Sequence, residues 1–452
     1  MREWELRPLC LALAGLVIGL SLGGAWWHAL FLVPLLVLCG SWRSRWVLTG
    51  AFLVGVVLHP ELNLPLVYED KPFRGTVDVI SVPQNTKTGR ASIVSTDVGR
   101  LLMYSPRSSQ IGMGDKLSLR GMIQPLRDGV VPIRGVVGAL RPVGDMTTLE
   151  FGSPIWKLGM QIRDGFVATT SARLDETTAG VIDALCFNVT TGLDEDLYED
   201  LRRTGTTHII STSGVHVIIT AGLFIFLLRQ LPIPRHWQLA LLVLLLLLYA
   251  GAAGFRPPIV RAVLMACVGL GSYLVRRDGD GLSAWAGAGL VYLILDPYTV
   301  ADLSFILSML AAGGLVLFMG RWEPHEWGWK TWLVKSIQVS FVAWVATLPV
   351  LVWVMGDVSL VSVLANLIID IPVTLIIWSA LLAWIISGLF PALAAGVLTE
   401  VTTPLANAML AVVDGMAAWP WASVALPPFS AYWLVPVYAG LLFIWRPNVR
   451  KA

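Results

Sequence analysis

Charged residues are scarce in this chain of 452 residues. Only 14% of the residues are Asp, Glu, Lys or Arg, whereas 56% are hydrophobic; an ordinary soluble domain is about 25% charged. Apolar runs such as LALLVLLLLLYAG, residues 239–251, are too long for the core of a soluble protein of this size. The composition therefore excludes a soluble globular protein and predicts a polytopic α-helical membrane protein.

Cysteine, histidine and nucleotide-binding motifs are also rare or missing. The four cysteines are scattered without a CxxC pair, which argues against a zinc site and against a disulfide framework. The six histidines are widely separated, and no GxxxxGK[ST] motif occurs. We expect no metal, no cofactor and no nucleotide hydrolysis in this chain.

The apolar segments define the organisation of the chain. Three of them, at about 9–24, 26–40 and 46–58, fall in an N-terminal transmembrane part, residues 1–60. Residues 150–204 read as an amphipathic, interfacial helical linker. Residues 205–452 form a polytopic part with nine further apolar segments: 205–228, 237–253, 259–275, 282–295, 300–319, 333–355, 359–388, 393–413 and 431–445.

The stretch between residues 69 and 145 differs from the rest of the chain. It is polar, contains turn residues, and alternates apolar and polar positions in five short runs, which predicts a small all-β domain. Five strands fit an OB-like barrel, although an SH3-like barrel has the same pattern. The runs are 74–82, 90–98, 100–105, 115–123 and 133–141.

The positions of the basic residues predict the orientation in the membrane. Cytoplasmic loops collect Lys and Arg, and an N-terminus placed inside leaves nearly all loop cations inside and residues 69–145 outside. Only Arg256 and Arg261 then gather on the outer side. The cations placed inside are Arg2, Arg7, Arg43, Arg45, Arg229, Arg235, Arg276, Arg277, Arg321, Lys330, Arg446, Arg450 and Lys451.

Polar residues cluster inside several of the apolar segments. Intramembrane polar groups are costly, and broken helices that carry them are tolerated where they line a cavity or pack inside protein. We therefore expect a water-filled path through the helices. The clusters lie in THIISTSGVHVIIT (207–220), AGFRPPIVRA (253–262), LDPYTVADLSFILS (295–308) and GDVSLVSVLANLIIDIP (356–372).

These clusters carry a resemblance to a known family. HIISTSGVHV, residues 208–217, resembles the H-L-L-A-I-S-G-L-H-V motif of the competence domain in ComEC-type DNA-uptake channels, and the three later clusters match further patterns of that family. The order of parts is similar as well: N-terminal helices, an outer OB-like domain, then the polytopic domain. The resemblance implies a cytoplasmic-membrane channel that carries incoming single-stranded DNA into the cytoplasm during natural transformation.

The resemblance also assigns candidate residues, which we carry over position by position. The candidates for the DNA path are His208, Ser213, Gly214, His216, Arg256, Arg261, Asp296, Ser304, Ser308, Asn366 and Asp370. The barrel candidates for DNA contact are Arg74, Arg90, Arg100, Tyr104, Lys116 and Arg120. Eleven Lys plus Arg against seven Asp plus Glu give residues 69–145 a net charge of +4, but Phe73 and Tyr104 are their only aromatic residues.

The sequence departs from the family pattern at three points. Ile306 replaces a usual glutamine, and Asp370 stands where a small or apolar residue is usual. Many family members end in a metallo-β-lactamase-like domain proposed to degrade the strand that is not transported, and no HxHxDH motif occurs in this chain. We therefore expect a separate nuclease, or a partial chain, besides a separate DNA receptor and a motor. Homo-oligomers are also compatible with the sequence.

Other interpretations of the same residues remain open. Residues 207–220 fit simple helix packing, and Ser213 beside His216 fits a membrane hydrolase, although no nucleophile elbow is present. Arg256 and Arg261 fit contacts with lipid headgroups, while Asn366 and Asp370 fit a hydrogen-bonded pair at a helix kink. A permease for another anionic solute is the alternative transport function, and the β-domain fits a scaffold as well as a DNA-binding module.

Overall fold

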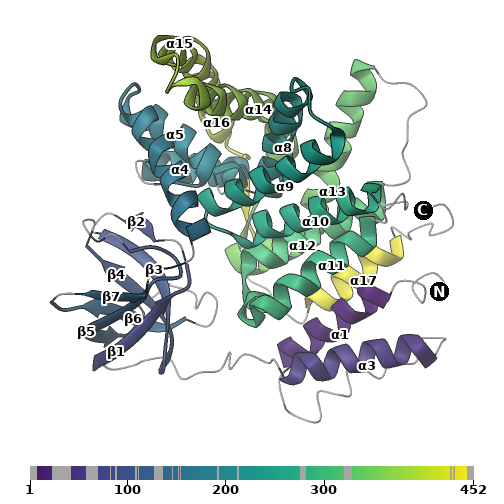
Figure 1. The fold of residues 1–452 in the computed structure, drawn as a ribbon. Helices are drawn as coiled ribbons and strands as arrows, with labels where there is room; N and C mark the ends of the chain where they lie inside the picture. The colour runs from purple at the N-terminus through teal and green to yellow at the C-terminus, as the bar shows by residue number, and fades with distance from the viewer. Residues whose placement is uncertain are drawn as a thin grey trace.

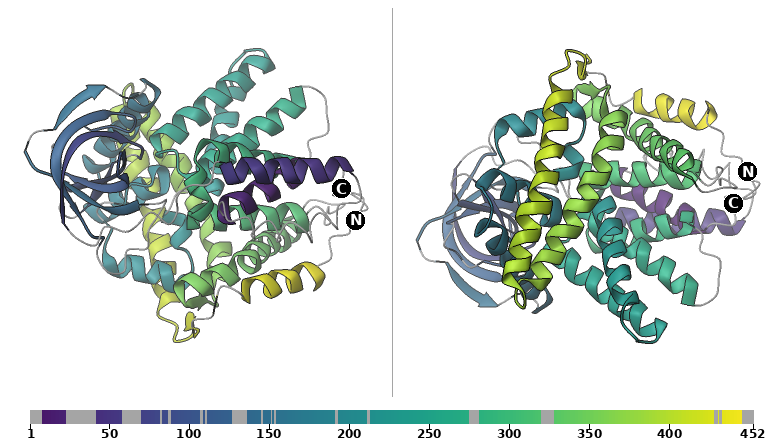
Figure 2. Two further views of the ribbon diagram at one scale, coloured as in Figure 1. Left: turned by 90° about the horizontal axis from the view of Figure 1, so that it is seen from below. Right: turned by 90° about the horizontal axis from the view of Figure 1, so that it is seen from above.

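The protein consists of a β-barrel domain at one side of a larger helical part (Figures 1 and 2). The computed structural model describes residues 8–22, 42–57, 70–81, 83–86, 89–106, 109, 111–126, 136–144, 146–150, 152, 154–190, 193–210, 213–274, 281–319, 328–427, 430 and 433–444. The prediction of a polytopic helical protein with a small all-β domain is confirmed. The apolar segment expected at 26–40 lies outside the described residues.

The barrel is a closed ring of five strands. β1, β3, β4, β6 and β5 follow one another around the ring, and β5 pairs again with β1. All pairings are antiparallel except that of β4 with β6, and a five-stranded ring of this kind is the arrangement of an OB-like fold. Two short strands that the sequence did not predict, β2 and β7, extend the sheet. The strands are β1 (Lys71–Val79), β2 (Gln84–Thr86), β3 (Gly89–Thr96), β4 (Gly99–Ser105), β5 (Lys116–Gln124), β6 (Val136–Pro142) and β7 (Thr147–Glu150).

Alternation of side chains explains why the barrel closes. Along β1, Phe73, Val77 and Val79 point into the barrel, while Arg74 and Asp78 between them are exposed. β4 and β5 repeat this period of two, which is typical of strands with one buried face, whereas the first five residues of β6 are all buried. The inward side chains of all five strands form one apolar core.

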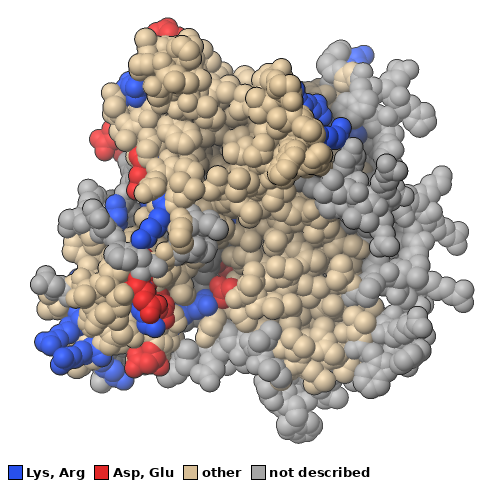
Figure 3. All heavy atoms as spheres, in the orientation of Figure 1, with Lys and Arg blue, Asp and Glu red and all other residues tan. Residues whose placement is uncertain are grey.

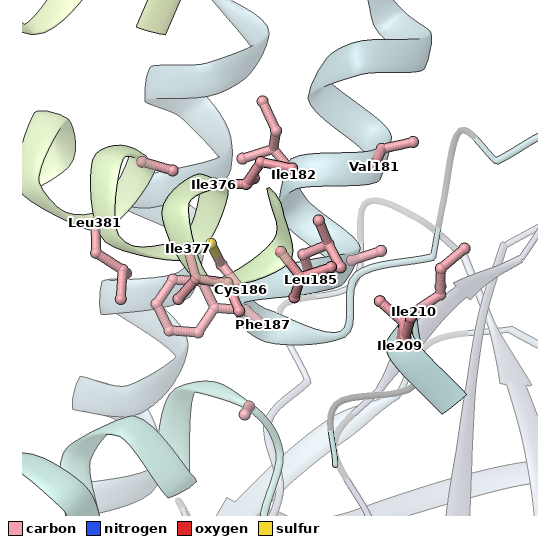
Figure 4. Close-up of a cluster of buried hydrophobic side chains, with 14 of the residues drawn as sticks. Val181, Ile182, Leu185, Cys186, Phe187, Ile209, Ile210, Ile376, Ile377 and Leu381 are labelled. Carbon is pink, nitrogen blue, oxygen red and sulfur yellow. The ribbon is translucent and has the colours of Figure 1, made fainter. Parts of the chain in front are cut away.

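Three linker helices connect the barrel to the membrane helices: α4 (Pro154–Ser171), α5 (Glu176–Phe187) and α6 (Glu195–Thr204). The buried face of α5 packs against the membrane helix α14 and the short helix α7, where Leu185 and Phe187 lie near Ile377 and Ile209 (Figure 4). This packing fixes the start of the region that holds the polar clusters.

Charge pairs join α6 to a small two-stranded sheet. Arg202 bonds the carboxylates of Glu199 at 2.7 Å and of Asp357, which begins β8. These carboxylates raise the pKa of Arg202 despite partial burial, and the Arg202 hydrogen bond lowers that of Glu199. β8 (Asp357–Ser359) pairs with β9 (Ser423–Ala425), so α6 is tied to the turns after two membrane helices.

The remaining helices form the membrane part. Four stretches are long and apolar enough to cross a membrane: Arg235–Ala252, Lys330–Met355, Ser362–Ile386 and Pro391–Ala417. α14 and α16 lie side by side (Figure 2, right). The helices are α1 (Pro8–Leu22), α3 (Trp42–Val57), α7 (Thr207–Ile210), α8 (Gly214–Arg229), α9 (Arg235–Ala252), α10 (Pro257–Leu274), α11 (Gly281–Leu295), α12 (Leu303–Met319), α13 (Trp329–Met355), α14 (Ser362–Ile386), α15 (Pro391–Val397), α16 (Thr403–Ala417) and α17 (Leu434–Ile444).

Small residues let the N-terminal helices approach the rest closely. Gly15 and Gly19 of α1 lie against the backbone of α3, where a Cβ on either glycine would meet main-chain atoms. This spacing of four residues is the small-residue pattern of packed membrane helices. α1 also contacts α11, so the N-terminal helices belong to the same helical assembly as the later ones.

One expected segment is interrupted. The stretch 205–228 was expected as a single apolar segment, on which His208, Thr212 and His216 would share a face of an unbroken helix. The structure ends α7 at Ile210 and begins α8 at Gly214; Thr212 lies outside the described residues. The single-helix expectation is therefore wrong, and the break places a helix N-terminus among the polar residues.

Candidate functional site

The N-terminus of α8 is built by a reciprocal cap. Ser213 is the N-cap residue, and its Oγ accepts a hydrogen bond from the amide of Val215 at 3.3 Å. The Nδ1 atom of His216 accepts from the amide of Ser213 at 3.0 Å and contacts its Oγ at 3.0 Å. This arrangement is a capping box in which histidine takes the place of the usual Glu or Gln. Ser213 and His216 thus hold the first turn of α8 in place.

His208 lies on the other side of the break. Its Nδ1 contacts the carbonyl oxygen of Gly205 at 3.1 Å, and its side chain is exposed. His216, in contrast, is buried, and its Nε2 has no hydrogen-bond partner among the described residues. The two histidines therefore have different surroundings although the motif contains both.

The second polar cluster enters the membrane part through an unusual turn. Gly254 and Phe255, between α9 and α10, both have positive φ angles, of 83° and 46°. A bulky residue in this region is strained, so the surrounding structure must hold the turn. The turn delivers Arg256 to the start of α10, where its carbonyl oxygen accepts the amides of Ile259 and Val260.

Arg261, one turn further along α10, is the central residue of the site. It is buried, with 6% of its surface exposed. Its guanidinium donates to Ser308 Oγ of α12 and contacts the Sδ atom of Met265 at 3.6 Å. A Cβ placed on Gly214 would lie 3.5 Å from the Nη2 atom of Arg261. Three segments that are far apart in the sequence therefore meet at this guanidinium, and we call Gly214, Arg261 and Ser308 the cationic junction.

α8 is shorter than a helix that spans the hydrocarbon core of a membrane. Its 16 residues span about 24 Å, whereas the hydrocarbon core is about 30 Å thick. If Arg229, the last residue of α8, lies at one interface, then Gly214 lies about 6 Å inside the other. A broken helix at such a depth is tolerated where it lines a cavity or is packed inside protein.

Two predicted candidates, one from each domain, pair with each other. Arg100 of β4 forms a salt bridge with Asp296 at 2.9 Å, and its guanidinium lies 4.0 Å from the ring centre of Tyr298. The side chains of the pair are mostly buried, at 16% and 26% exposure. The strands equivalent to β3 and β4 carry the nucleic-acid face in many OB folds. Here Arg100, on one of these strands, contacts Asp296 and Tyr298 of the helical part, so its guanidinium is engaged within the protein.

The other barrel candidates differ in their surroundings. Arg90 donates to the carbonyl oxygen of Ser109 at 3.0 Å. Arg74 and Arg120 are exposed and stand directly opposite each other on β1 and β5. Like charges in such positions repel. Figure 3 shows Lys and Arg side chains gathered over the barrel, whereas the helices present a mostly uncharged surface.

Lys116 and Tyr104 complete the predicted set in the barrel. Lys116 stands opposite Asp78 of β1, where opposite charges favour the pairing. Tyr104, on β4, lies beneath the guanidinium of Arg141 at 6.0 Å from the ring centre. Both residues are half-buried.

The last polar cluster lies apart from the cationic junction. Asn366 and Asp370 are on α14, one turn apart, and Asp370 is exposed. No hydrogen bond joins these two side chains in the described part of the chain, and Asn366 Oδ1 is buried without a partner there. Ser304, exposed on α12, lies one turn before Ser308, and its amide donates to Asp302 at 2.8 Å.

Two residues in these segments were not predicted as site residues. Asp302 caps α12 by accepting the amides of Ser304 and Phe305. Its position just before an apolar run is a readable cap signal. Tyr298 supports Arg100, and no local pattern could indicate a partner almost two hundred positions away.

Neither a metal site nor a catalytic triad is evident in the described part of the chain. No group of three His, Cys, Asp or Glu residues is placed to hold a metal ion there. The contact between Ser213 and His216 belongs to the helix cap, and no described carboxylate hydrogen-bonds the imidazole to complete a triad.

These features define a multi-pass membrane protein with an attached OB-like barrel and a cationic junction among its broken helices. Comparison with known families agrees: the Competence protein family model matches residues 185–451, more than half of the chain. The chain therefore belongs to the Competence protein family. No solved structure matches it.

The relatives of the chain are similar over part of their length. It is 29% identical over 210 residues to ComE operon protein 3 of Bacillus subtilis, covering 46% of this chain and 26% of that protein. It is 29% identical over 269 residues to competence protein ComA of Neisseria gonorrhoeae, covering 56% and 36%. YcaI of Escherichia coli, whose function is uncharacterised, is 29% identical over 262 residues, covering 55% and 34%. The matches thus span about a third or less of each relative.

Proposed function

We propose that this chain is a channel of a bacterial cytoplasmic membrane that carries single-stranded DNA into the cytoplasm during natural transformation. The observation that carries the proposal is the cationic junction: Gly214, Arg261 and Ser308 come from three separate segments and meet inside the matched region. DNA is a chain of phosphate anions, and a buried cation among neutral polar groups suits their passage. The matched family and one of the relatives are named for competence.

In this proposal, the predicted path residues have different roles. Arg261 and Ser308 contact the strand directly, whereas Ser213 and His216 hold the first turn of α8 in position. Ser304 and His208, both exposed, lie along the path before or after the junction. The remaining candidates, Arg256, Asn366 and Asp370, belong to the same path at other levels.

We propose that both termini are cytoplasmic and that the barrel is extracytoplasmic, as the loop cations predict. The barrel then meets incoming DNA first, and the exposed pair Arg74 and Arg120 attracts its phosphates. A thiol at Val98, exposed in the turn between β3 and β4, tests this orientation in a variant without the native cysteines. Labelling by a membrane-impermeant reagent in intact spheroplasts supports it, and labelling only after lysis contradicts it.

The channel is proposed to work without catalysis of its own. A separate receptor, a separate nuclease and a cytoplasmic helicase or ATPase would complete the pathway, and homo-oligomers are compatible with it. Purified protein is expected neither to cut DNA nor to hydrolyse esters. Hydrolysis that is lost in Ser213→Ala would instead establish the hydrolase alternative.

The direct test is transformation of a strain that lacks the gene. Labelled double-stranded DNA is supplied, and surface-bound label is separated from label that resists added nuclease. The intact gene should restore nuclease-resistant entry, while surface binding is unchanged by its loss. Entry that is equal with and without the gene contradicts the proposal. Restored uptake of a small phosphate ester, without DNA entry, favours a permease for anionic solutes.

A further inference from the structure

Arg261 is a buried guanidinium without a counter-ion among the described residues. Among the described residues its partners are a hydroxyl and a thioether sulfur, and its Nε has no partner there. Two carboxylates of the neighbouring polar cluster are engaged elsewhere, since Asp302 caps α12 and Asp296 pairs with Arg100. A buried charge is unfavourable unless it is paired, so the structure lacks a negative partner at this point.

The N-terminus of α8 adds a second positive group at the same place. The cap residue Ser213 accepts the amides of Val215 and His216, so the amide of Gly214 is the one left for a ligand among these first three, and the helix dipole makes this end partly positive. Gly214 is the first residue of α8 and lies against the Nη2 atom of Arg261. A side chain here would come between the guanidinium and this amide, so the glycine keeps the two groups accessible to one ligand.

Ser308 contributes a neutral donor. Its Oγ accepts from Arg261, which leaves its own O–H to donate. The guanidinium, the amide of Gly214 and this hydroxyl are all donors, and oxyanions are bound by such sets at helix N-termini. In membrane transporters, broken helices present their N-termini to anionic groups of the substrate in the same way.

We propose that the cationic junction is an oxyanion-binding site that holds one phosphodiester group between Arg261 and the N-terminus of α8. The identification of the bound group as a phosphate of the transported strand rests on the proposed function. The assignment of the junction as an oxyanion site does not depend on that function. A single site suits a moving polyanion, because each phosphate is held by few contacts and is released when the next one arrives.

The test uses the full-length protein in detergent micelles and three variants. Arg261→Met removes the charge at similar length, and Arg261→Lys keeps the charge but loses the fork of donors. Arg229→Met is the matched control, because Arg229 is an exposed arginine at the far end of α8 from the junction. The first probe is inorganic phosphate, compared with chloride at equal ionic strength, with the thermal unfolding midpoint as readout. The second probe is a labelled oligothymidylate, titrated at several salt concentrations.

The proposal predicts that phosphate raises the unfolding midpoint of the wild type and of Arg229→Met, but not of Arg261→Met. The slope of log K against log salt for the oligonucleotide should fall by about 0.7 in Arg261→Met, the value for one lost phosphate of a single strand. Arg261→Lys should lie between the two. Without phosphate, Arg261→Met should unfold at the same or a higher temperature, because an unpaired buried charge is removed.

Two results overturn the oxyanion site. One is an unchanged phosphate effect and salt slope in Arg261→Met. The other is a lower midpoint of Arg261→Met together with no phosphate effect in the wild type, which would make Arg261 a packing residue. A phosphate effect that depends on Arg261, without oligonucleotide binding, retains the site and contradicts the proposed function. Competition by micellar phosphatidylglycerol but not by oligothymidylate identifies a lipid headgroup and overturns the assignment to DNA.

Discussion

Replacing His216 separates a helix cap from a DNA contact. His216→Gln and His216→Leu both remove the imidazole, but only glutamine can accept the amide of Ser213 from the same position, as it does in ordinary capping boxes. In the structure this bond measures 3.0 Å, and the remaining ring nitrogen has no described partner. The two variants therefore differ in the cap and share the loss of the ring.

The cost of each substitution follows from these contacts. Leucine leaves the partly buried amide of Ser213 without its acceptor, and this loss of the cap costs about 1–3 kcal/mol. Leucine also removes the unpartnered Nε2, which stabilises the folded state by about 1 kcal/mol. We expect His216→Leu to lower the free energy of unfolding by up to about 2 kcal/mol, and His216→Gln by about 0.5 kcal/mol or less.

Equilibrium unfolding in mixed micelles and nuclease-resistant DNA entry are then measured on both variants. If His216 positions α8, the glutamine variant should keep DNA entry near the wild-type level, and the leucine variant should lose most of it. A glutamine variant that is as stable as the wild type but admits no DNA would refute this reasoning. In that case the imidazole itself contacts the strand.

Three further predictions concern other parts of the fold. Arg100→Met and Asp296→Asn should be coupled by about 1 kcal/mol in a double-mutant cycle of unfolding, because the pair is largely shielded and supported by an aromatic ring; strictly additive effects would contradict the contact. Burial raises the pKa of Asp183, in the linker helix α5, to about 7. Between these pKa values the native state keeps a proton that the unfolded state releases. The stability that this group contributes is therefore full below pH 4 and falls by up to about 4 kcal/mol as the pH rises to 7. Asp183→Asn should flatten the pH profile of the unfolding free energy, and an unchanged profile would exclude Asp183 as the source of that pH dependence. Gly205→Ala should cost about 2–4 kcal/mol, because φ is +71° and the new Cβ would lie 2.8 Å from Cβ atoms of two serines; Gly50→Ala, in open space on α3, is the control, and equal stability of both variants would contradict the argument.

Regular elements were predictable from the sequence because their patterns are local. The alternation in 74–82 corresponds to β1, and the apolar runs at 237–253 and 359–388 correspond to α9 and α14 within a few residues. The end of α7 before the extended residue Ser213 was missed because apolar residues lie in both helices. Ser213 followed by His216 has the spacing of a capping box, but histidine is not its usual third residue.

The sequence was sufficient to select residues of the candidate site, but not to predict which of them contact one another. Arg261 and Ser308 were each selected because polar groups in apolar segments are costly, yet nothing in the sequence pairs them, since α10 and α12 meet only through helix packing. The same limit applies to Arg100 and Asp296, which are separated by 196 positions. Their contact depends on how the barrel docks on the helices, and this is a property of the whole fold.

The most direct test of the central claim is photo-crosslinking of DNA caught during transport. A benzoylphenylalanine replaces Ser304, which is exposed on α12 one turn before Ser308, and a second variant carries it at Leu389, which is 80% exposed after α14. Labelled DNA blocked at one end by a bulky protein is supplied, so that the strand stops inside the channel. The account predicts a crosslink at position 304 that is lost with Arg261→Met, and none at position 389. DNA that is held in transit without any crosslink at 304, or with equal crosslinks at both positions, would contradict it.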